Sequence, residues 1–118
     1  MNERDETSLL NIKDEIEVLM ELIDGYGLQQ FLDDEKTKRS VCMTLINIGE
    51  LVKPLSEELK QMYPGVRWSS IAGLRDIAAH NYGGLRMDRI WGNVTVDVPV
   101  LLEQVKGILR DEGVEEEE

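Results

Sequence analysis

The sequence of 118 residues predicts an all-α fold, an up-and-down antiparallel bundle of four to five helices. Two observations lead to this prediction. Apolar residues recur at steps of three and four along most of the chain, which gathers them on one face of each helix. Few segments alternate between apolar and polar residues as strands do. A chain of this length buries a single core, so we expect one helical domain over residues 1–110.

The first helix is expected to begin at a cap formed by Thr7 or Ser8 and to end at Gly25 and Gly27. A short connection, residues 28–34, follows it. The apolar stripe of this helix consists of Leu9, Ile12, Ile16, Leu19 and Ile23.

The second helix has the most regular stripe, and Pro54 within it predicts a kink or a locally broken hydrogen bond. A loop with a Pro-Gly pair, residues 62–68, leads to a third helix capped by Ser69 or Ser70. The sequence NYGG, residues 81–84, ends this third helix. The two stripes are Val41, Leu45, Ile48, Val52, Leu55 and Leu59, then Ile71, Leu74, Ile77 and Ala78.

The last helix carries a long stripe from Met87 to Ile108. Val94–Val98 is rich in β-branched residues and Pro99 follows it, so a strand is an alternative there, but the unbroken helical spacing favours a helix. The chain then ends in residues 111–118, which have no apolar face and several like charges. We expect these residues to form an acidic, disordered tail.

The charge balance is strongly acidic, with 24 acidic against 13 basic residues and a net charge of −11. This balance argues against general attraction to nucleic acid or to an anionic membrane. The local balance differs between residues 62 and 91, which hold four arginines, no lysine and two acidic residues.

The single cysteine, Cys42, excludes an internal disulfide and a cysteine-based zinc site, and its place in an apolar stripe favours burial. The first ten residues are charged and lack the apolar core of a signal peptide. No apolar run approaches the roughly 18 residues that span a membrane. We therefore expect a cytoplasmic protein with no membrane partner.

One cluster of reactive side chains stands out, and it contains the only histidine of the chain. It comprises Arg75, Asp76, His80, Asn81 and Tyr82. An imidazole transfers protons near neutral pH, and a guanidinium binds phosphate oxygens and stabilises charge that develops on them. Together these two groups suffice for metal-free cleavage of RNA by its own 2′-hydroxyl. We expect no metal and no cofactor, because one histidine with scattered carboxylates forms no recognisable ligand set.

On a regular helix Arg75 and His80 lie about 140° apart, so they do not point the same way. Either the helix ends before His80 and turns the imidazole back, or a second subunit supplies a matching pair across a dimer axis. A purely structural interpretation is also open. In it, His80 caps the helix and Arg75 pairs with Asp76 or Glu50.

The octet RDIAAHNY, residues 75–82, resembles the Arg-x4-His-x-Tyr motif of HEPN-domain proteins of the HepT-like branch. The stretch INIGELVKPLSEEL, residues 46–59, resembles the same family, and so does the segment from residue 66 to residue 105 around the motif. The resemblance covers residues 5 to 110, all but the acidic tail.

This resemblance implies an up-and-down helical bundle that forms homodimers, with two copies of the motif in one cleft. It implies a metal-independent endoribonuclease that is the toxin of a toxin–antitoxin pair. The partner would be a minimal nucleotidyltransferase, the antitoxin, which transfers AMP to the motif tyrosine.

Carried onto this chain, the resemblance makes Arg75 and His80 the catalytic residues. Arg75 would bind the scissile phosphate, and His80 would act as general base or acid. Asp76 and Asn81 would support them, and Tyr82 would accept AMP. Asp76 departs from the asparagine common at its position. Its carboxylate would either repel the substrate phosphate or hold His80 in one tautomer and raise the pKa of His80.

Two other functions are compatible with the sequence. A non-catalytic HEPN module would bind a nucleotide phosphate through Arg75, or dock onto the nucleotidyltransferase, and His80 would then be structural. A plain interaction bundle is the third possibility. The sequence identifies neither the RNA target nor the neighbouring gene.

Overall fold

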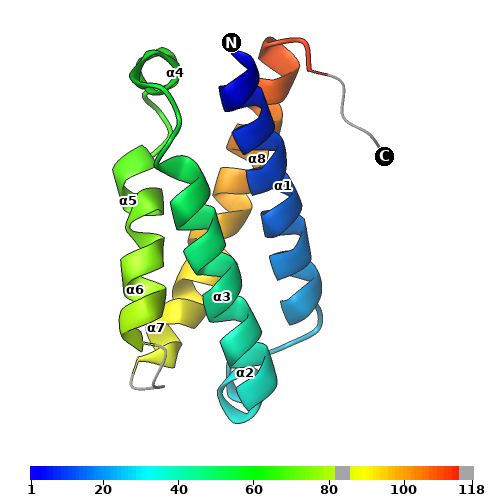
Figure 1. Ribbon diagram of the computed structural model, residues 1–118. Coiled ribbons are helices and arrows are strands. Elements are labelled where there is room, and N and C mark those ends of the chain that lie inside the picture. Colours follow the sequence, from blue (N-terminus) through cyan, green and yellow to red (C-terminus); the bar gives the residue numbers. More distant parts are fainter. Residues whose placement is uncertain (82–85, 115–118) are drawn as a thin grey trace.

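A computed structural model describes residues 1–81 and 86–114, and these residues form helices and no strand. Four helical rods run alternately up and down, which confirms the predicted all-α antiparallel bundle (Figure 1). The rods are α1 (Glu3–Ile23), α3 (Glu35–Val52), α5 (Trp68–Ala72) with α6 (Leu74–Asn81), and finally α7 (Met87–Gly92), the π-helix η1 (Asn93–Asp97) and α8 (Val98–Asp111).

Two short helices, α2 (Leu28–Asp33) and α4 (Glu57–Met62), lie at opposite ends of the bundle (Figure 1). The segment 28–34, predicted as a plain connection, is therefore mostly helical. Its anchor is Phe31, which is fully buried and packs against the ring of Trp91 with 5.0 Å between ring centroids. Burial of this aromatic side chain stabilises a turn that local propensity alone would not hold.

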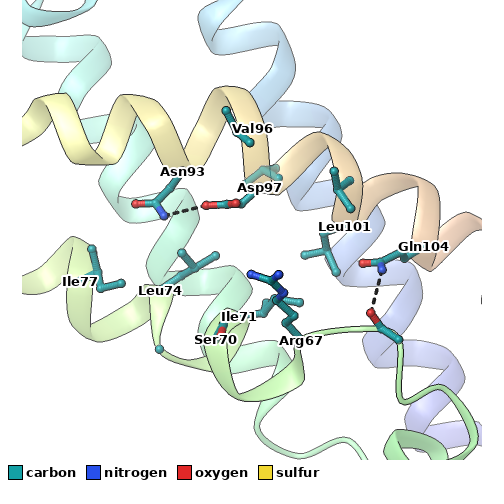
Figure 2. Close-up of a pocket in the computed structure, with 14 residues that line it drawn as sticks. Arg67, Ser70, Ile71, Leu74, Ile77, Asn93, Val96, Asp97, Leu101 and Gln104 are labelled. Atoms are coloured by element: carbon teal, nitrogen blue, oxygen red, sulfur yellow. Dashed lines mark hydrogen bonds between the residues drawn. The ribbon is translucent and has the colours of Figure 1, made fainter.

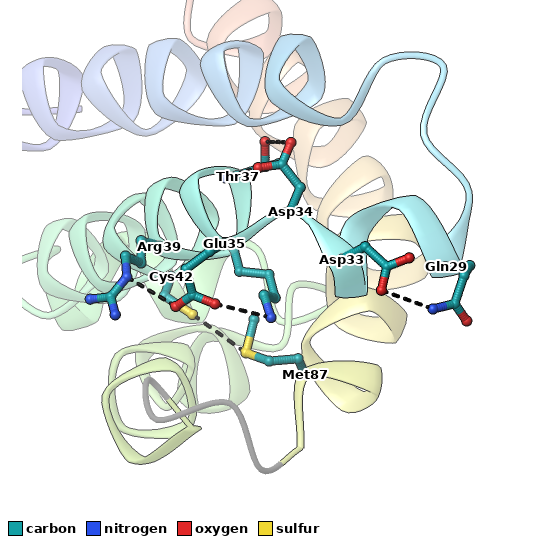
Figure 3. Close-up of polar contacts among 9 residues, drawn as sticks. Gln29, Asp33, Asp34, Glu35, Thr37, Arg39, Cys42 and Met87 are labelled. Atoms are coloured by element: carbon teal, nitrogen blue, oxygen red, sulfur yellow. Dashed lines mark hydrogen bonds and ion pairs between the residues drawn. The ribbon is translucent and has the colours of Figure 1, made fainter.

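The core confirms most of the predicted stripes; the exceptions are Ile77 of the third stripe, which is 38% exposed, and Ile23 of the first, which is partly buried. Every stripe residue of the second helix is buried, and Cys42 is 1% exposed, as predicted. The Cys42 thiol lies 4.0 Å from the sulfur of Met87, which joins α3 to α7 (Figure 3). Burial also raises the pKa of this thiol, which disfavours the reactive thiolate. Of the first stripe, Leu9, Ile12, Ile16 and Leu19 are fully buried.

The helix caps differ from those predicted. Asn2 caps α1, because its side-chain oxygen accepts a hydrogen bond from the Asp5 N–H at 2.7 Å. Thr7 and Ser8, the expected caps, lie inside the helix. Asp34 caps α3 by accepting from the N–H and the hydroxyl of Thr37 at 3.0 and 2.8 Å (Figure 3). Each terminus thus uses a side-chain oxygen to satisfy N–H groups that have no helical partner.

Pro54 ends a helix and does not kink one. α3 stops at Val52, and α4 starts after Ser56, whose hydroxyl accepts from the Leu59 N–H at 3.2 Å. The buried carboxylate of Asp5 accepts from the Ser56 N–H at 3.0 Å and so ties α1 to this corner. The stripe continues across the break because α4 packs on the same core.

The third rod is also interrupted. α5 begins at Trp68, so Ser69 and Ser70 do not cap it, and Gly73 separates it from α6. The indole N–H of Trp68 donates to the Tyr63 carbonyl at 3.0 Å, which fixes the start of α5. α6 then extends through Asn81.

In the last rod the strand alternative is wrong. Val98 donates its backbone N–H to the Asn93 carbonyl, five residues earlier, and forms the π-helical turn η1. Pro99, which has no N–H to donate, follows in the first turn of α8. The segment rich in β-branched residues is therefore helical, and its one irregularity is the wider π-helical turn of η1.

The last described residues contact the domain. Val114 packs against the core, and the carboxylate of Glu112 lies 3.3 Å from the amino group of Met1. Residues 111–114, assigned to the predicted tail, thus belong to the packed part. Residues 115–118 lie outside the described residues.

Gly49 on α3 allows α6 to approach closely. A Cβ atom built on Gly49 would lie 2.7 Å from the Cβ of Arg75, 2.8 Å from the Arg75 nitrogen and 2.9 Å from the Ala72 carbonyl oxygen. Real Cβ contacts are not that short, and two of these neighbours are backbone atoms that cannot turn away. A side chain at residue 49 would force the two helices apart.

We therefore expect Gly49→Ala to lower the free energy of unfolding by about 1–3 kcal/mol, as overpacking does in well-packed cores. Urea denaturation followed by circular dichroism would measure the loss. Gly92→Ala is the matched control, because nothing lies within 4 Å of a Cβ built there. Equal stability of Gly49→Ala and Gly92→Ala would contradict the tight contact.

Candidate functional site

The predicted reactive residues lie on the outward face of α6. Leu74 and Ala78 are buried and anchor the helix to the core, while Arg75, Asp76 and His80 are exposed. The sequence places these side chains by alternating a buried stripe with a polar surface in helical register. One rigid element therefore presents all three.

Arg75 is held between two carboxylates. Its Nε donates to Oε1 of Glu50 on α3 at 2.8 Å, and its Nη1 donates to Oδ1 of the adjacent Asp76 at 3.0 Å. These two carboxylates, Asp76 first, raise the pKa of the Arg75 guanidinium above its ordinary value. The Arg75 side chain is 44% exposed, so it remains accessible to a ligand.

His80 lies within α6, one residue before its last residue, Asn81. The helix does not end before His80, so the arrangement in which the chain turns the imidazole back towards Arg75 is wrong. On a regular helix the two side chains point about 140° apart. Arg75 and His80 of one chain therefore leave α6 in different directions.

The two supporting residues are engaged locally. Asn81 donates its side-chain amide to the Ile77 carbonyl at 2.8 Å, which satisfies a carbonyl near the end of α6. The Asp76 carboxylate is bound to Arg75, and no hydrogen bond joins it to His80 within the described residues. Tyr82, the predicted AMP acceptor, lies outside the described residues.

A groove of about 930 Å³ runs beside the predicted site, between the α5–α6 rod and the η1–α8 rod (Figure 2). We call it the α6–α8 groove. Arg75 and His80 do not line it, but Ile77 of the same helix does. Ile77, Val96 and Val100 line the groove and are 38%, 64% and 56% exposed. Three of the exposed large hydrophobic side chains of the described residues thus gather at one groove.

Arg67 also lines the groove, and its guanidinium points into it (Figure 2). Within the described residues the guanidinium of Arg67 forms no hydrogen bond or ion pair, in contrast to the guanidinium of Arg75. Asp97, across the groove, accepts from the side-chain amide of Asn93 at 3.0 Å.

Of these groove residues, Ile77 was predicted to belong to a buried stripe, and Arg67, Val96 and Val100 were not predicted as site residues. A signal for them does exist. Val96 and Val100 are four residues apart, so they share one side of the rod, while the core positions Val94, Val98 and Leu101 occupy another. Two aliphatic stripes on one rod indicate two packed surfaces, of which the domain itself buries one.

The described residues, 1–81 and 86–114, contain neither a clustered set of metal ligands nor a membrane-spanning helix. No group of three or more histidine, cysteine, aspartate or glutamate side chains there is arranged to hold a metal ion. No helix in residues 1–81 and 86–114 combines the length and apolar character needed to cross a bilayer.

Comparison with known proteins places the chain in a family. The family described as Ribonuclease HepT-like matches residues 12–108. A protein of Caldanaerobacter subterraneus subsp. tengcongensis, provisionally named as an RNase, is 36% identical over 88% of this chain and 93% of its own length.

Two archaeal relatives agree. A protein of Methanocaldococcus jannaschii, also provisionally named as an RNase, is 34% identical over 92% of this chain and 90% of its own length. A protein of Thermococcus cleftensis, named as a probable ribonuclease HepT, is 32% identical over 79% of this chain and 84% of its own length. No solved structure matches. The chain therefore belongs to the HepT-like ribonuclease family, which confirms both the predicted family and the predicted class of enzyme.

Proposed function

We propose that this protein is a metal-independent endoribonuclease whose active site combines Arg75 and His80 from two copies of the chain. The observation that carries the proposal is the placement of a guanidinium and the sole imidazole on the exposed face of one helix, in a chain of the HepT-like ribonuclease family. We further propose that it acts in the cytoplasm as the toxin of a toxin–antitoxin pair.

The chemistry needs two proton transfers. One imidazole takes the proton of the 2′-hydroxyl as its oxygen attacks the adjacent phosphorus. A second imidazole gives a proton to the 5′-oxygen that leaves, and the products are a 2′,3′-cyclic phosphate and a 5′-hydroxyl. Arg75 stabilises the negative charge that grows on the phosphate oxygens. A single chain has one histidine, so two copies of His80 supply the base and the acid.

The α6–α8 groove supports the dimer. A partner that removes the exposed aliphatic side chains of the groove from water would lower the free energy of the assembly. These side chains are Ile77, Val96 and Val100. Because α6 also forms one wall of the groove, a second copy seated there would bring its own α6 close to the first. The different directions in which Arg75 and His80 leave α6 also support such a partner.

The first prediction concerns catalysis. We expect His80→Ala to lower cleavage of bulk RNA in EDTA by about 10²–10⁴-fold, because it removes the proton-transfer group. We expect Arg75→Ala to lower it by about 10²–10³-fold, because it removes the charge that stabilises the transition state.

Arg86→Ala is the matched control for the arginine, because Arg86 is also exposed and lies 3.4 Å from an aspartate, Asp88. The preparation is first checked by intact mass for bound AMP. Unchanged cleavage in both His80→Ala and Arg75→Ala would overturn the proposed site.

The second prediction concerns assembly. We expect wild-type protein to sediment as a dimer at micromolar concentration and Val96→Glu to sediment as a monomer, because the introduced carboxylate would be buried without a partner. Val18→Glu is the control, since Val18 is 48% exposed on α1, away from the groove. A wild-type monomer, or a Val96→Glu dimer, would exclude this groove as the dimer interface.

The third prediction concerns regulation by a minimal nucleotidyltransferase. We propose that this antitoxin transfers AMP to Tyr82, the residue that follows α6 in sequence, because a bulky anion there would repel the substrate phosphate. We expect wild type incubated with the neighbouring nucleotidyltransferase and ATP to gain the mass of adenylate, and Tyr82→Phe to gain none. Modification of Tyr82→Phe would show that another residue is the acceptor.

One observation favours a second candidate function. Both carboxylates on Arg75 compete with a substrate phosphate, which suits a non-catalytic module that binds a nucleotide weakly or docks onto the nucleotidyltransferase. Nucleotide binding that survives His80→Ala, with no cleavage by an unmodified wild-type dimer, would support this candidate over the nuclease.

A further inference from the structure

Glu50 is placed beside Arg75 by the helix packing, and the sequence separation of 25 residues shows that the pair is tertiary. Gly49 lets the backbone of α6 lie against α3, and the next residue, Glu50, then reaches Nε of Arg75 at 2.8 Å. Glu50 is itself 3.5 Å from Nζ of Lys53 on the following turn. Both cations lie at the same oxygen, Oε1, so Lys53 gives the Glu50 carboxylate a second positive partner beside Arg75.

Asp76 engages Arg75 in a different way. It is the next residue in sequence, its side chain is 75% exposed, and within the described residues its carboxylate pairs with Arg75 alone. Rotation of this side chain into water breaks a single bond, at 3.0 Å, between its Oδ1 and Nη1 of Arg75. Asp76 is thus the easily released partner, whereas Glu50 is the anchored one.

The guanidinium has five N–H groups on three nitrogens. Glu50 occupies one on Nε and Asp76 occupies one on Nη1, while Nη2 has no hydrogen bond within the described residues. A phosphate binds an arginine best through two parallel N–H groups. Asp76 occupies one of the two N–H groups of Nη1 and places a negative charge beside it, so a phosphate on Nη1 and Nη2 meets less competition once Asp76 leaves.

We propose that Glu50 is a positioning residue that orients Arg75, and that Asp76 is a displaceable internal competitor for the substrate phosphate. The proposal rests on the proposed nuclease function. It assigns opposite effects to two carboxylates that touch the same guanidinium. Loss of Glu50 frees Arg75 to move and slows catalysis, whereas loss of the Asp76 charge weakens its contact with Nη1, removes its repulsion of a phosphate and so tightens RNA binding.

The binding test uses a 2′-O-methyl RNA of mixed sequence, which lacks the attacking hydroxyl and so stays intact. We expect Asp76→Asn to bind it about 2- to 5-fold more tightly than wild type, the range for one exposed ion pair. Asp88→Asn is the matched control, since it removes the same charge from an exposed aspartate paired with Arg86. Asp76→Asn binding no tighter than Asp88→Asn would overturn the role of Asp76.

The positioning test uses cleavable RNA. We expect Glu50→Ala to lower kcat at least about 10-fold, with a smaller change in KM, because Arg75 is no longer held in place. Glu50→Gln should recover most of kcat, since its amide oxygen still accepts from Nε. Glu35→Ala is the control, because it removes a glutamate that pairs with Nε of Arg39 at 3.0 Å, elsewhere on α3. Wild-type kcat in Glu50→Ala would overturn the role of Glu50.

A separate readout does not depend on cleavage. The Nε–H group of Arg75 is assigned in ¹⁵N spectra by its loss in Arg75→Lys. We expect it to be protected from exchange with water in wild type and Glu50→Gln, and to exchange rapidly in Glu50→Ala. If wild type cleaves no RNA, the proposed function fails, and the exchange and binding measurements still decide the two roles. Equal protection in wild type and Glu50→Ala would contradict the anchor directly.

Discussion

The close contact between α3 and α6 at Gly49 is the constraint on which the surface around Arg75 depends. Without a side chain at residue 49, the backbone of α6 lies against α3, and Leu74 and Ala78 are driven into the core. The side chain of Arg75 then lies at the edge of this helix contact, where its Nε donates to Glu50. The glycine at residue 49 thus determines how closely the two helices pack, and the close packing brings Arg75 to the carboxylate of Glu50.

The same helix distributes its other side chains by its rotation of about 100° per residue. Arg75 faces the α3 side and Ile77 faces the α6–α8 groove, with Asp76 and His80 on the surface between them. Because α6 is helical through Asn81, this separation is rigid. This separation agrees with the proposal that a second copy completes the site, and the exposed aliphatic groove beside α6 is the surface proposed for that copy.

The sequence predicted the parts of this structure that depend on periodicity. Stripes at helical spacing identified the buried faces, since burial and period have the same physical cause. Helix ends were predicted less well. The cap of α1 is Asn2, directly before the acidic first turn, and not Thr7 or Ser8. At Pro54 the helix ends completely and does not bend, because tertiary packing permits the break. The π turn at Asn93–Asp97 has no periodic signature of its own, because it changes the phase of the stripe by only one residue.

The candidate site, like the fold, was predicted in part from the sequence. The motif residues were identified from their types and from the resemblance to the family. The packing alternative expected Arg75 to pair with Asp76 or Glu50, and Arg75 contacts both. What spacing could not supply was the difference between those two partners. That difference lies in Lys53 beside Glu50 and in the exposure of Asp76, both of which follow from how α3 and α6 sit together.

A chain with a net charge of −11 gains little from diffuse attraction to RNA, and a site with few phosphate contacts gains little from counterion release. The cations near α6 are arginines, and the one in the motif is already neutralised by neighbouring carboxylates. Under the proposed role of Arg75, productive binding requires a substrate phosphate to meet Nη1 and Nη2 in the right orientation. Discrimination among RNAs would then rest on how a substrate presents that phosphate, because the acidic surface elsewhere repels the RNA backbone.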